Sequence, residues 1–190
     1  MKIGLVGEAP NDTTAIQNLL SRQYQHLEFV TLLNRINGSM LDNGKAISRL
    51  LRVEYEYQKP NIIIFIRDLD ALESDRIAKK KRQDTFTYSN RIINHTGIHL
   101  LNIFEIEALI LADIATFNDR YGCQIDEFED PMLIPMPKEV LIEATRNKFT
   151  VSHNPELFSL LNFEILKQNC RYFSLFIKKF ERAISASSSI

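Results

Sequence analysis

The feature that most constrains the fold is the segment at residues 61–70, which reads NIIIFIRDLD. Residues 62–66 form an uninterrupted apolar run, and such a run is typical of a parallel strand that is covered by helices on both faces. The run then ends in Arg67, Asp68 and Asp70. Open parallel sheets bind their ligands beyond the carboxyl ends of the strands. The segment therefore predicts a central buried strand that delivers charged side chains to a functional edge.

Further apolar runs alternate with segments of helical character along the first two thirds of the chain. We predict strands at residues 2–7, 27–33, 61–66 and 98–104. We predict helices up to about residue 22, from 44 until a stop at Pro60, over 73–95 and from 105 onward, with Asn11 or Asp12 as the cap of the first, and turns at 36–39 and 42–44. This alternation predicts the α/β class, with a mainly parallel, Rossmann-like sheet flanked by helices.

The residue composition and the predicted secondary structure change after Gly122. Residues 126–130 are acidic, prolines punctuate the segment that follows, and several short helices are predicted up to about residue 186. We therefore divide the chain into an α/β domain at 1–121 and a helical extension at 122–190 that packs on it as one compact unit. A chain of 190 residues with 45% apolar side chains can bury a core of this size. Residues 185–190 are expected to fray.

The charge balance excludes two classes of protein. Twenty-three Lys and Arg face 24 Asp and Glu, so the net charge of −1 is neither that of a polycation nor that of an acidic disordered chain. A local basic patch can still hide within a neutral sum. No stretch approaches the ~20 apolar residues that span a bilayer, and Glu8 interrupts the N-terminal apolar run before it reaches the length of a secretion signal. We expect a cytoplasmic protein with no membrane partner, whose two cysteines, Cys123 and Cys170, are reduced thiols.

Acidic residues follow three of the predicted strands. Glu8 follows the first, Asp68 and Asp70 follow the central one, and Glu105 and Glu107 follow the next, with Asp12 one turn beyond Glu8. Carboxylates gathered at one edge repel one another unless a cation lies between them. Oxygen ligands of this kind suit Mg²⁺ or Mn²⁺, and the DxD spacing places both aspartates on one side of an extended segment. A metal site is therefore predicted. For Glu105 and Glu107 a second interpretation, stabilisation of a helix N-terminus, stays open.

Three other protein classes carry paired acids or a phosphate-binding loop, and the sequence weakens each. A haloacid-dehalogenase-type phosphatase has its DxD after the first strand and a later Gly-Asp-rich motif, whereas here the DxD follows an internal strand and that motif is missing. A receiver domain has paired acids after its first strand and a lysine after its last, but only Glu8 stands at the first of these places and no lysine ends the run at 98–104. The GxxxxGK[ST] loop of P-loop enzymes is absent from the sequence.

A basic run follows the DxD segment. Next to an acidic metal centre, such a run would bind the phosphates of a nucleic acid. The alternative is that it forms the solvated face of a helix. The candidates for nucleic-acid binding are Arg67, Arg76, Lys79, Lys80, Lys81 and Arg82.

The order of the acidic motifs resembles that of a known fold family. A glutamate after the first strand, Gly7-Glu8, followed by Asp68-Leu69-Asp70 after a later apolar strand, resembles the Toprim fold of topoisomerases, primases and overcoming-lysogenization-defect (OLD) nucleases. The runs at 104–113 (FEIEALILAD) and 169–176 (NCRYFSLF) are similar to the small Toprim-like proteins encoded beside an ATPase in bacterial and phage-defence loci. The resemblance thus extends over nearly the whole chain. One departure is Ala9-Pro10 after Glu8, where many relatives have a glycine.

The resemblance implies a metal-dependent nuclease or related phosphotransfer enzyme that acts on DNA or RNA in phage defence or DNA repair. Glu8 would be the catalytic acid or base or a metal ligand, and Asp68 and Asp70 would hold Mg²⁺ or Mn²⁺. Glu107 would be a further acid, with Glu105 as a less specific match and Asp12 close by. The alternative is a non-catalytic Toprim scaffold that binds an ATPase partner or a nucleotide. The sequence does not distinguish DNA from RNA as the substrate, or a monomer from a homodimer as the oligomeric state.

Overall fold

The computed structural model describes residues 1–34 and 36–187, and within them lies one sheet of four parallel strands. The strands are β1 (Lys2–Val6), β2 (Glu28–Thr31), β3 (Ile62–Asp68) and β4 (Gly97–Asn102), in the order β2-β1-β3-β4. The prediction of an α/β fold with a parallel sheet flanked by helices is thereby confirmed. The third strand extends two residues beyond the apolar run, because Arg67 and Asp68 pair with Leu101 and Asn102 of β4.

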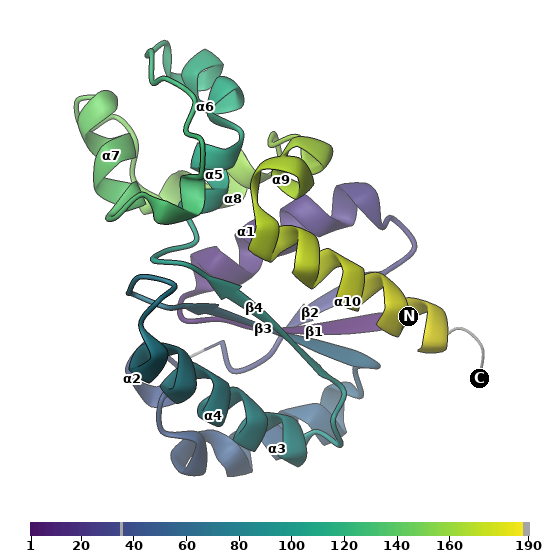
Figure 1. Cartoon of the computed structure of the whole chain (residues 1–190). Helices are drawn as coiled ribbons and strands as arrows, with labels where there is room; N and C mark the ends of the chain where they lie inside the picture. Colours follow the sequence, from purple (N-terminus) through teal and green to yellow (C-terminus); the bar gives the residue numbers. More distant parts are fainter. Residues whose placement is uncertain (35, 188–190) are drawn as a thin grey trace.

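Helices cover both faces of this sheet (Figure 1). On one side lie α1 (Pro10–Gln23) and α10 (Arg171–Ser187), and on the other lie α3 (Gly44–Gln58) and α4 (Arg76–Ile92). Side chains of a strand alternate between the faces. Ile62, Ile64 and Ile66 accordingly belong to the core under α1 and α10, whereas Ile63 and Phe65 belong to the core under α3. This double coverage explains why residues 62–66 are apolar without interruption.

The first helix begins earlier than the sequence suggested. Neither Asn11 nor Asp12 is its cap: Ala9 holds the N-cap position and Pro10 is the first helical residue, where a proline costs no hydrogen bond. Asp12 lies inside the first turn, and its carboxylate accepts a hydrogen bond from the Ala9 amide at 3.1 Å. The helix therefore fixes Asp12 near the end of β1.

The connection between β2 and α3 contains a short helix that the turn pattern did not predict. This helix, α2 (Gly38–Leu41), lies at residues expected to form a turn, because the Asn37 side chain accepts the Met40 amide at 3.1 Å and so caps it. Asn43 caps α3 in the same way, through the Ala46 amide. The helix α3 ends at Gln58, before Pro60.

The fourth helix is shorter than predicted, since Asp75 caps it by accepting the amides of Ile77 and Ala78. Beyond β4 the described chain consists of helices joined by loops, without a further strand. The elements are α5 (Ala108–Ala112), α6 (Ile114–Tyr121), α7 (Pro137–Ala144), α8 (Asn154–Phe158), α9 (Phe163–Asn169) and α10, with 3₁₀ turns at Pro131–Leu133 and Val151–His153.

Apolar side chains from these later helices join the core that β1, β3 and α1 build. Asn18 of α1 also donates a hydrogen bond to the Pro155 carbonyl of α8 at 2.7 Å. The division of the chain at residue 121 stays a prediction. The expected fraying at 185–187 is wrong, because α10 continues through Ser187, and residues 188–190 lie outside the described residues. No helix in the described ranges is both long and apolar enough to cross a bilayer.

Candidate functional site

Four carboxyl groups meet beyond the carboxyl ends of the strands, and we call them the acid cluster: Glu8, Asp12, Asp68 and Glu107. Glu8 follows β1, Asp68 ends β3, Asp12 lies in the first turn of α1 and Glu107 directly precedes α5. The charges of Glu107 and Glu8 raise the pKa of Asp12, and the charges of Asp12, Glu8 and Glu107 raise the pKa of Asp68. These four carboxyl groups are therefore close enough to interact electrostatically.

Asp68 is the centre of the acid cluster. Burial raises its pKa well above the ordinary value, and the charges of Asp12, Glu8 and Glu107 raise it further. A hydrogen bond from Asn102 Nδ2 to Asp68 Oδ1, at 2.9 Å, acts in the opposite direction. Asn102 ends the neighbouring strand β4 and faces the same side of the sheet as Asp68, so the sheet itself positions this bond.

The pKa values of Asp12 and Glu107 are also raised. Burial, followed by the charges of Glu107 and Glu8, raises the pKa of Asp12 to about 7, although the Ala9 amide lowers it. Burial also raises the pKa of Glu107, against a hydrogen bond that Asn154 Nδ2 donates to Glu107 Oε1 at 2.8 Å. Within the described part of the chain, no Lys or Arg forms an ion pair with Asp12, Asp68 or Glu107. Glu107 is buried, Asp12 and Asp68 are half-buried, and the charge of Lys138 lowers the pKa of Glu107 without forming an ion pair with it.

The acid cluster suits a hard divalent cation by its donor chemistry. Its members offer carboxylate oxygens, which Mg²⁺ and Mn²⁺ prefer. The Oδ1 atom of buried Asn154 is a further oxygen, and it has no hydrogen-bond partner among the residues described. Among residues 1–34 and 36–187, however, no group of three or more His, Cys, Asp or Glu side chains is already arranged to hold a metal ion. The residues fit such an ion in type, and their side chains would have to draw together to bind it.

Glu8 differs from the other members because it has a cationic partner. Arg67 Nε lies 2.8 Å from Glu8 Oε1, yet this nitrogen makes no aligned hydrogen bond, so the contact is an ion pair of imperfect geometry. Glu8 Oε1 also accepts the Asp68 amide at 3.2 Å. Glu8 is therefore held between the end of β3 and the Arg67 guanidinium group.

Two of the residues predicted as metal ligands, Asp70 and Glu105, lie apart from the acid cluster. Asp70 has a left-handed backbone with φ of 56°, so the alternation expected for an extended DxD segment does not apply to it. Its side chain is 59% exposed and pairs with Arg82 at 2.7 Å. Glu105 pairs with Lys138 at 2.8 Å and acts on the acid cluster only through its charge on Glu107.

The basic candidates divide into three that pair with Asp42, of which the two arginines are largely buried and Lys81 is exposed, and three that do not pair with it. Arg67, Lys81 and Arg82 converge on Asp42, a residue the sequence marked only as part of a turn. Lys80 pairs with Asp84 along the exposed face of α4, and Lys79 pairs with Glu73 and lies 3.1 Å from the Tyr172 hydroxyl. Arg76 is exposed at the start of α4. No signal in the sequence distinguishes these two sets of basic residues.

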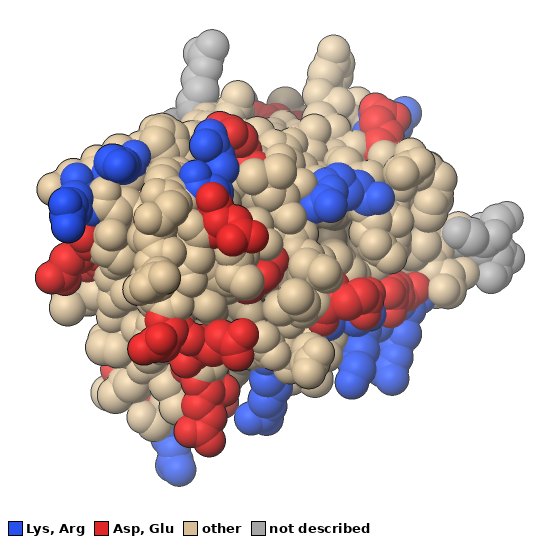
Figure 2. All heavy atoms as spheres, turned by 90° about the horizontal axis from the view of Figure 1, so that it is seen from above, with Lys and Arg blue, Asp and Glu red and all other residues tan. Residues whose placement is uncertain are grey.

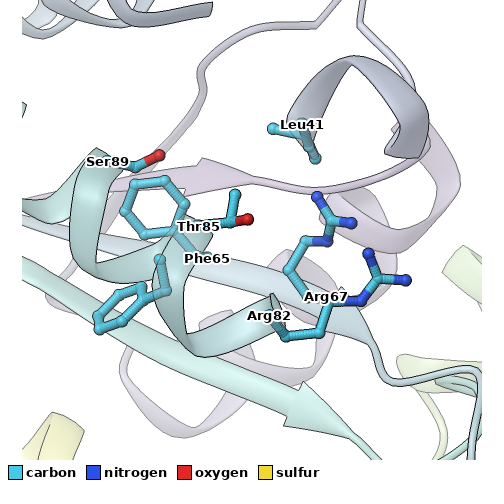
Figure 3. A pocket seen from close by; sticks show the side chains of 7 residues that line it. Leu41, Phe65, Arg67, Arg82, Thr85 and Ser89 are labelled. Carbon is cyan, nitrogen blue, oxygen red and sulfur yellow. The ribbon is translucent and has the colours of Figure 1, made fainter. Parts of the chain in front are cut away.

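Arg67 and Asp68 are adjacent in the chain but face opposite sides of the sheet. Asp68 follows the alternation of Ile64 and Ile66 toward α1 and α10, and Arg67 follows that of Ile63 and Phe65 toward α3. Figure 3 shows Arg67 and Arg82 beside a hollow that Leu41, Phe65, Thr85 and Ser89 also line. The hollow has a volume of about 10 Å³, which is room for about one water molecule.

Sequence reasoning missed Asp42, Asn102 and Asn154. Asn102 had a usable signal, because it stands within the run predicted as a strand next to the central one. Asp42 and Asn154 had none, since their partners lie 25 and 47 residues away along the chain. Seen from above, the described surface carries its acidic and basic side chains in several separate groups, with no single basic patch on that face (Figure 2).

Comparison of the chain with protein-family models, with curated proteins and with solved structures found no match. The resemblance to Toprim-like proteins therefore stays a prediction.

Proposed function

We propose that this protein is a Mg²⁺- or Mn²⁺-dependent nuclease or related phosphotransfer enzyme of the Toprim type. One observation carries the proposal: half-buried Asp12 and Asp68 and buried Glu107 interact electrostatically, have raised pKa values and form no ion pair within the described residues. Burying mutually repelling carboxyl groups costs stability unless a cation binds among them. Such an arrangement at the ligand-binding edge of a parallel sheet supports a metal-dependent role.

Asp12, Asp68 and Glu107 are the residues that would hold the cation, with Glu8 next to them. A divalent cation supplies positive charge that polarises a phosphate oxygen and favours an attacking hydroxide. Asn102 and Asn154 each occupy one oxygen of a carboxyl group, Asp68 Oδ1 and Glu107 Oε1, and so orient the other oxygen. Glu8 is partly exposed beside Arg67, where its carboxylate is placed to take a proton from water or give one to a leaving oxygen.

The substrate we propose is DNA or RNA. Two arginines lie close to the acid cluster, because Arg82 Nε donates to the Asp68 carbonyl at 2.8 Å and Arg67 pairs with Glu8. Cations in this position would bind phosphates of the nucleic-acid backbone without reading its sequence.

The experiment is a cleavage assay on plasmid DNA and on RNA with Mg²⁺ or Mn²⁺ and purified protein. Asp68→Asn and Glu8→Gln should each lower the cleavage rate by about a hundredfold or more, because one removes a metal ligand and the other a proton-transfer group. Asp70→Asn is the matched control, since Asp70 belongs to the same DxD segment but pairs with Arg82 outside the acid cluster. Undiminished cleavage by both Asp68→Asn and Glu8→Gln would refute the assignment.

A second function, a non-catalytic scaffold that binds an ATPase partner or a nucleotide, is favoured by one observation. Glu8 is already neutralised by Arg67, and the described residues hold no ready-made group of three metal-ligating side chains. A scaffold would bind its partner in the presence of a chelator and would show no turnover in any metal. Cleavage that requires both the metal and the ATPase would assign the activity to the complex.

A further inference from the structure

One carboxylate in this protein collects three cations. Asp42 Oδ1 pairs with Arg67 Nη2 at 2.6 Å and with Arg82 Nη1, and Asp42 Oδ2 pairs with Lys81 Nζ at 2.6 Å. Burial alone would raise the pKa of Asp42, but the hydrogen bond from Lys81 and the charges of Arg67 and Arg82 outweigh it and lower the pKa. We call Arg67, Lys81 and Arg82 the cation triad.

The two arginines of the cation triad are held in place by groups other than Asp42. Their side chains are only 7% and 10% exposed. Arg67 also pairs with Glu8, while Arg82 donates to the Asp68 carbonyl at 2.8 Å and to Asp70 at 2.7 Å. Because β3 and α4 fix them in this way, both guanidinium groups would stay in position if the Asp42 carboxylate moved away.

The segment that carries Asp42 is attached to the rest of the protein by fewer groups than the two arginines are. It comprises α2 and the residues on either side of it, 37–43, and Leu41 is the member of α2 that is buried. Met40 is exposed, and the Asp42 side chain itself is 22% exposed, so solvent reaches it. Movement of this segment would expose the cation triad without breaking the sheet.

The same segment also covers Glu8. A Cβ atom on Gly38 would lie 2.3 Å from Glu8 Oε2, so only a glycine allows this close approach. Arg67 Nη2 further lies 3.5 Å from the Gly38 carbonyl. Residues 37–43 therefore lie against both the cation triad and Glu8, an acid of the cluster whose side chain is partly exposed.

Two guanidinium groups and an ammonium group around one anion are the ligands that proteins use for phosphate. Guanidinium groups pair with carboxylate and with phosphate through the same planar geometry, and lysine adds a point charge. The hollow beside the arginines has room for about one water molecule and a mainly apolar lining, so the three cations alone would supply the contacts to a phosphate (Figure 3).

We propose that the cation triad is a subsite for a backbone phosphate of a nucleic acid, and that the Asp42 carboxylate takes the place of this phosphate when no nucleic acid is bound. The inference rests on the proposed function for the identity of the ligand. Binding of a phosphate displaces Asp42, moves residues 37–43 and uncovers Glu8. Substrate entry and exposure of the acid cluster are thereby coupled through one side chain.

The test measures binding of inorganic phosphate and of a short single-stranded oligonucleotide by calorimetry, in a chelator without divalent metal. Asp42→Asn should bind both probes about tenfold more tightly than the unsubstituted protein, because the internal competitor has lost its charge. Asp84→Asn removes the same charge from a residue that pairs only with exposed Lys80, and it should change either affinity by less than about twofold. Since no metal is present, the outcome is independent of whether the acid cluster cleaves anything.

Three further variants secure the interpretation. Leu41→Ala weakens the attachment of the segment without changing any charge, and it should tighten phosphate binding by about threefold even if Asp42→Asn fails to fold. In the Asp42→Asn background, Lys81→Gln should cancel most of the gain for phosphate, whereas Lys80→Gln should not. The proposal is overturned if neither Asp42→Asn nor Leu41→Ala tightens binding of either probe. Tighter binding of inorganic phosphate alone would overturn the assignment to a nucleic acid.

Discussion

Two neighbouring residues at the end of β3 lead into charge networks of opposite character. On one side of the sheet, Asp68 joins the acid cluster, in which three carboxyl groups are buried or half-buried and form no ion pair within the described residues. On the other side, Arg67 joins the cation triad, whose charges are matched by Asp42, Glu8 and Asp70. The compensated network stabilises the fold as it stands, whereas the uncompensated one is at its most favourable when a ligand supplies the missing charge.

The largest expected difference between the two networks is in stability. Arg67→Met leaves Glu8 without its cationic partner and takes one of three cations from Asp42, and it should lower the free energy of unfolding by about 3 kcal/mol. Asp68→Asn removes a repelling charge from the acid cluster and should leave that free energy unchanged or raise it. Chemical denaturation of both variants in a chelator measures the contrast. Equal destabilisation by the two substitutions would contradict it.

The second difference is in pH dependence. The pKa of Asp12 is raised from 3.8 to about 7 in the folded protein, so the folded state binds its proton more tightly than the unfolded state. The stability it contributes is fully present below about pH 4 and is lost as the pH rises through about 7, a change of roughly 3–4 kcal/mol. Asp42 behaves in the opposite way, because its lowered pKa contributes stability that is lost only as the pH falls through that pKa.

Asp12→Asn isolates the acid cluster in this experiment. Between pH 4 and 7 the free energy of unfolding of the unsubstituted protein should fall relative to that of Asp12→Asn, and Mg²⁺ should reduce the fall by favouring the ionised carboxylate. Parallel stability curves for the two proteins across this range would show that Asp12 is not perturbed by its neighbours.

The third comparison concerns the amides that hold the carboxyl groups. Asn154→Ala removes the buried hydrogen bond to Glu107 and should cost about 2 kcal/mol of stability, in addition to weakening metal affinity. Asn169→Ala, which removes a hydrogen bond to the neutral Ala112 carbonyl, should cost about 1 kcal/mol and leave metal affinity unchanged. Thermal denaturation without Mn²⁺ measures the loss of stability, and the additional stabilisation by Mn²⁺ measures the metal affinity. A metal affinity that falls equally in the two variants would remove Asn154 from the site.

The smallest expected effect is at the contact that joins the two networks. Gly38→Ala places a methyl group against Glu8 Oε2 and should displace the carboxylate at a cost of about 1 kcal/mol. Cleavage should fall because Glu8 moves, whereas Met40→Ala, on the exposed side of the same short helix, should leave the cleavage rate unchanged. Equal rates for Gly38→Ala and the unsubstituted protein would show that the position of Glu8 is not important.

The sequence was sufficient for those features that depend on local pattern. The apolar run at 62–66 predicted the central strand, and the rule that ligands bind beyond strand ends led to Glu8, Asp68 and the later acid Glu107. These residues lie where the backbone direction of a strand or helix start places them, so a local pattern is informative about them.

The remaining features depend on contacts between distant parts of the chain or on irregular backbone. Asp70 lies outside the acid cluster because its backbone has a left-handed conformation. The DxD spacing alone does not predict this conformation. Asp42 and Asn154 acquire their partners only when α2 and α8 pack against the ends of the strands. The net charge of −1 likewise does not reveal that opposite charges lie on opposite sides of the sheet. This separation arises because the adjacent residues Arg67 and Asp68 point to different faces of β3.

The most direct test of the central claim is a calorimetric titration of the protein with Mn²⁺, comparing Asp68→Asn with Asp70→Asn. The two substitutions remove the same charge from the same DxD segment, one inside the acid cluster and one outside it. The account predicts that the unsubstituted protein and Asp70→Asn bind Mn²⁺ with similar affinity and that Asp68→Asn binds it at least about tenfold more weakly. Equal affinity in all three proteins, or an equal loss in both variants, would contradict it.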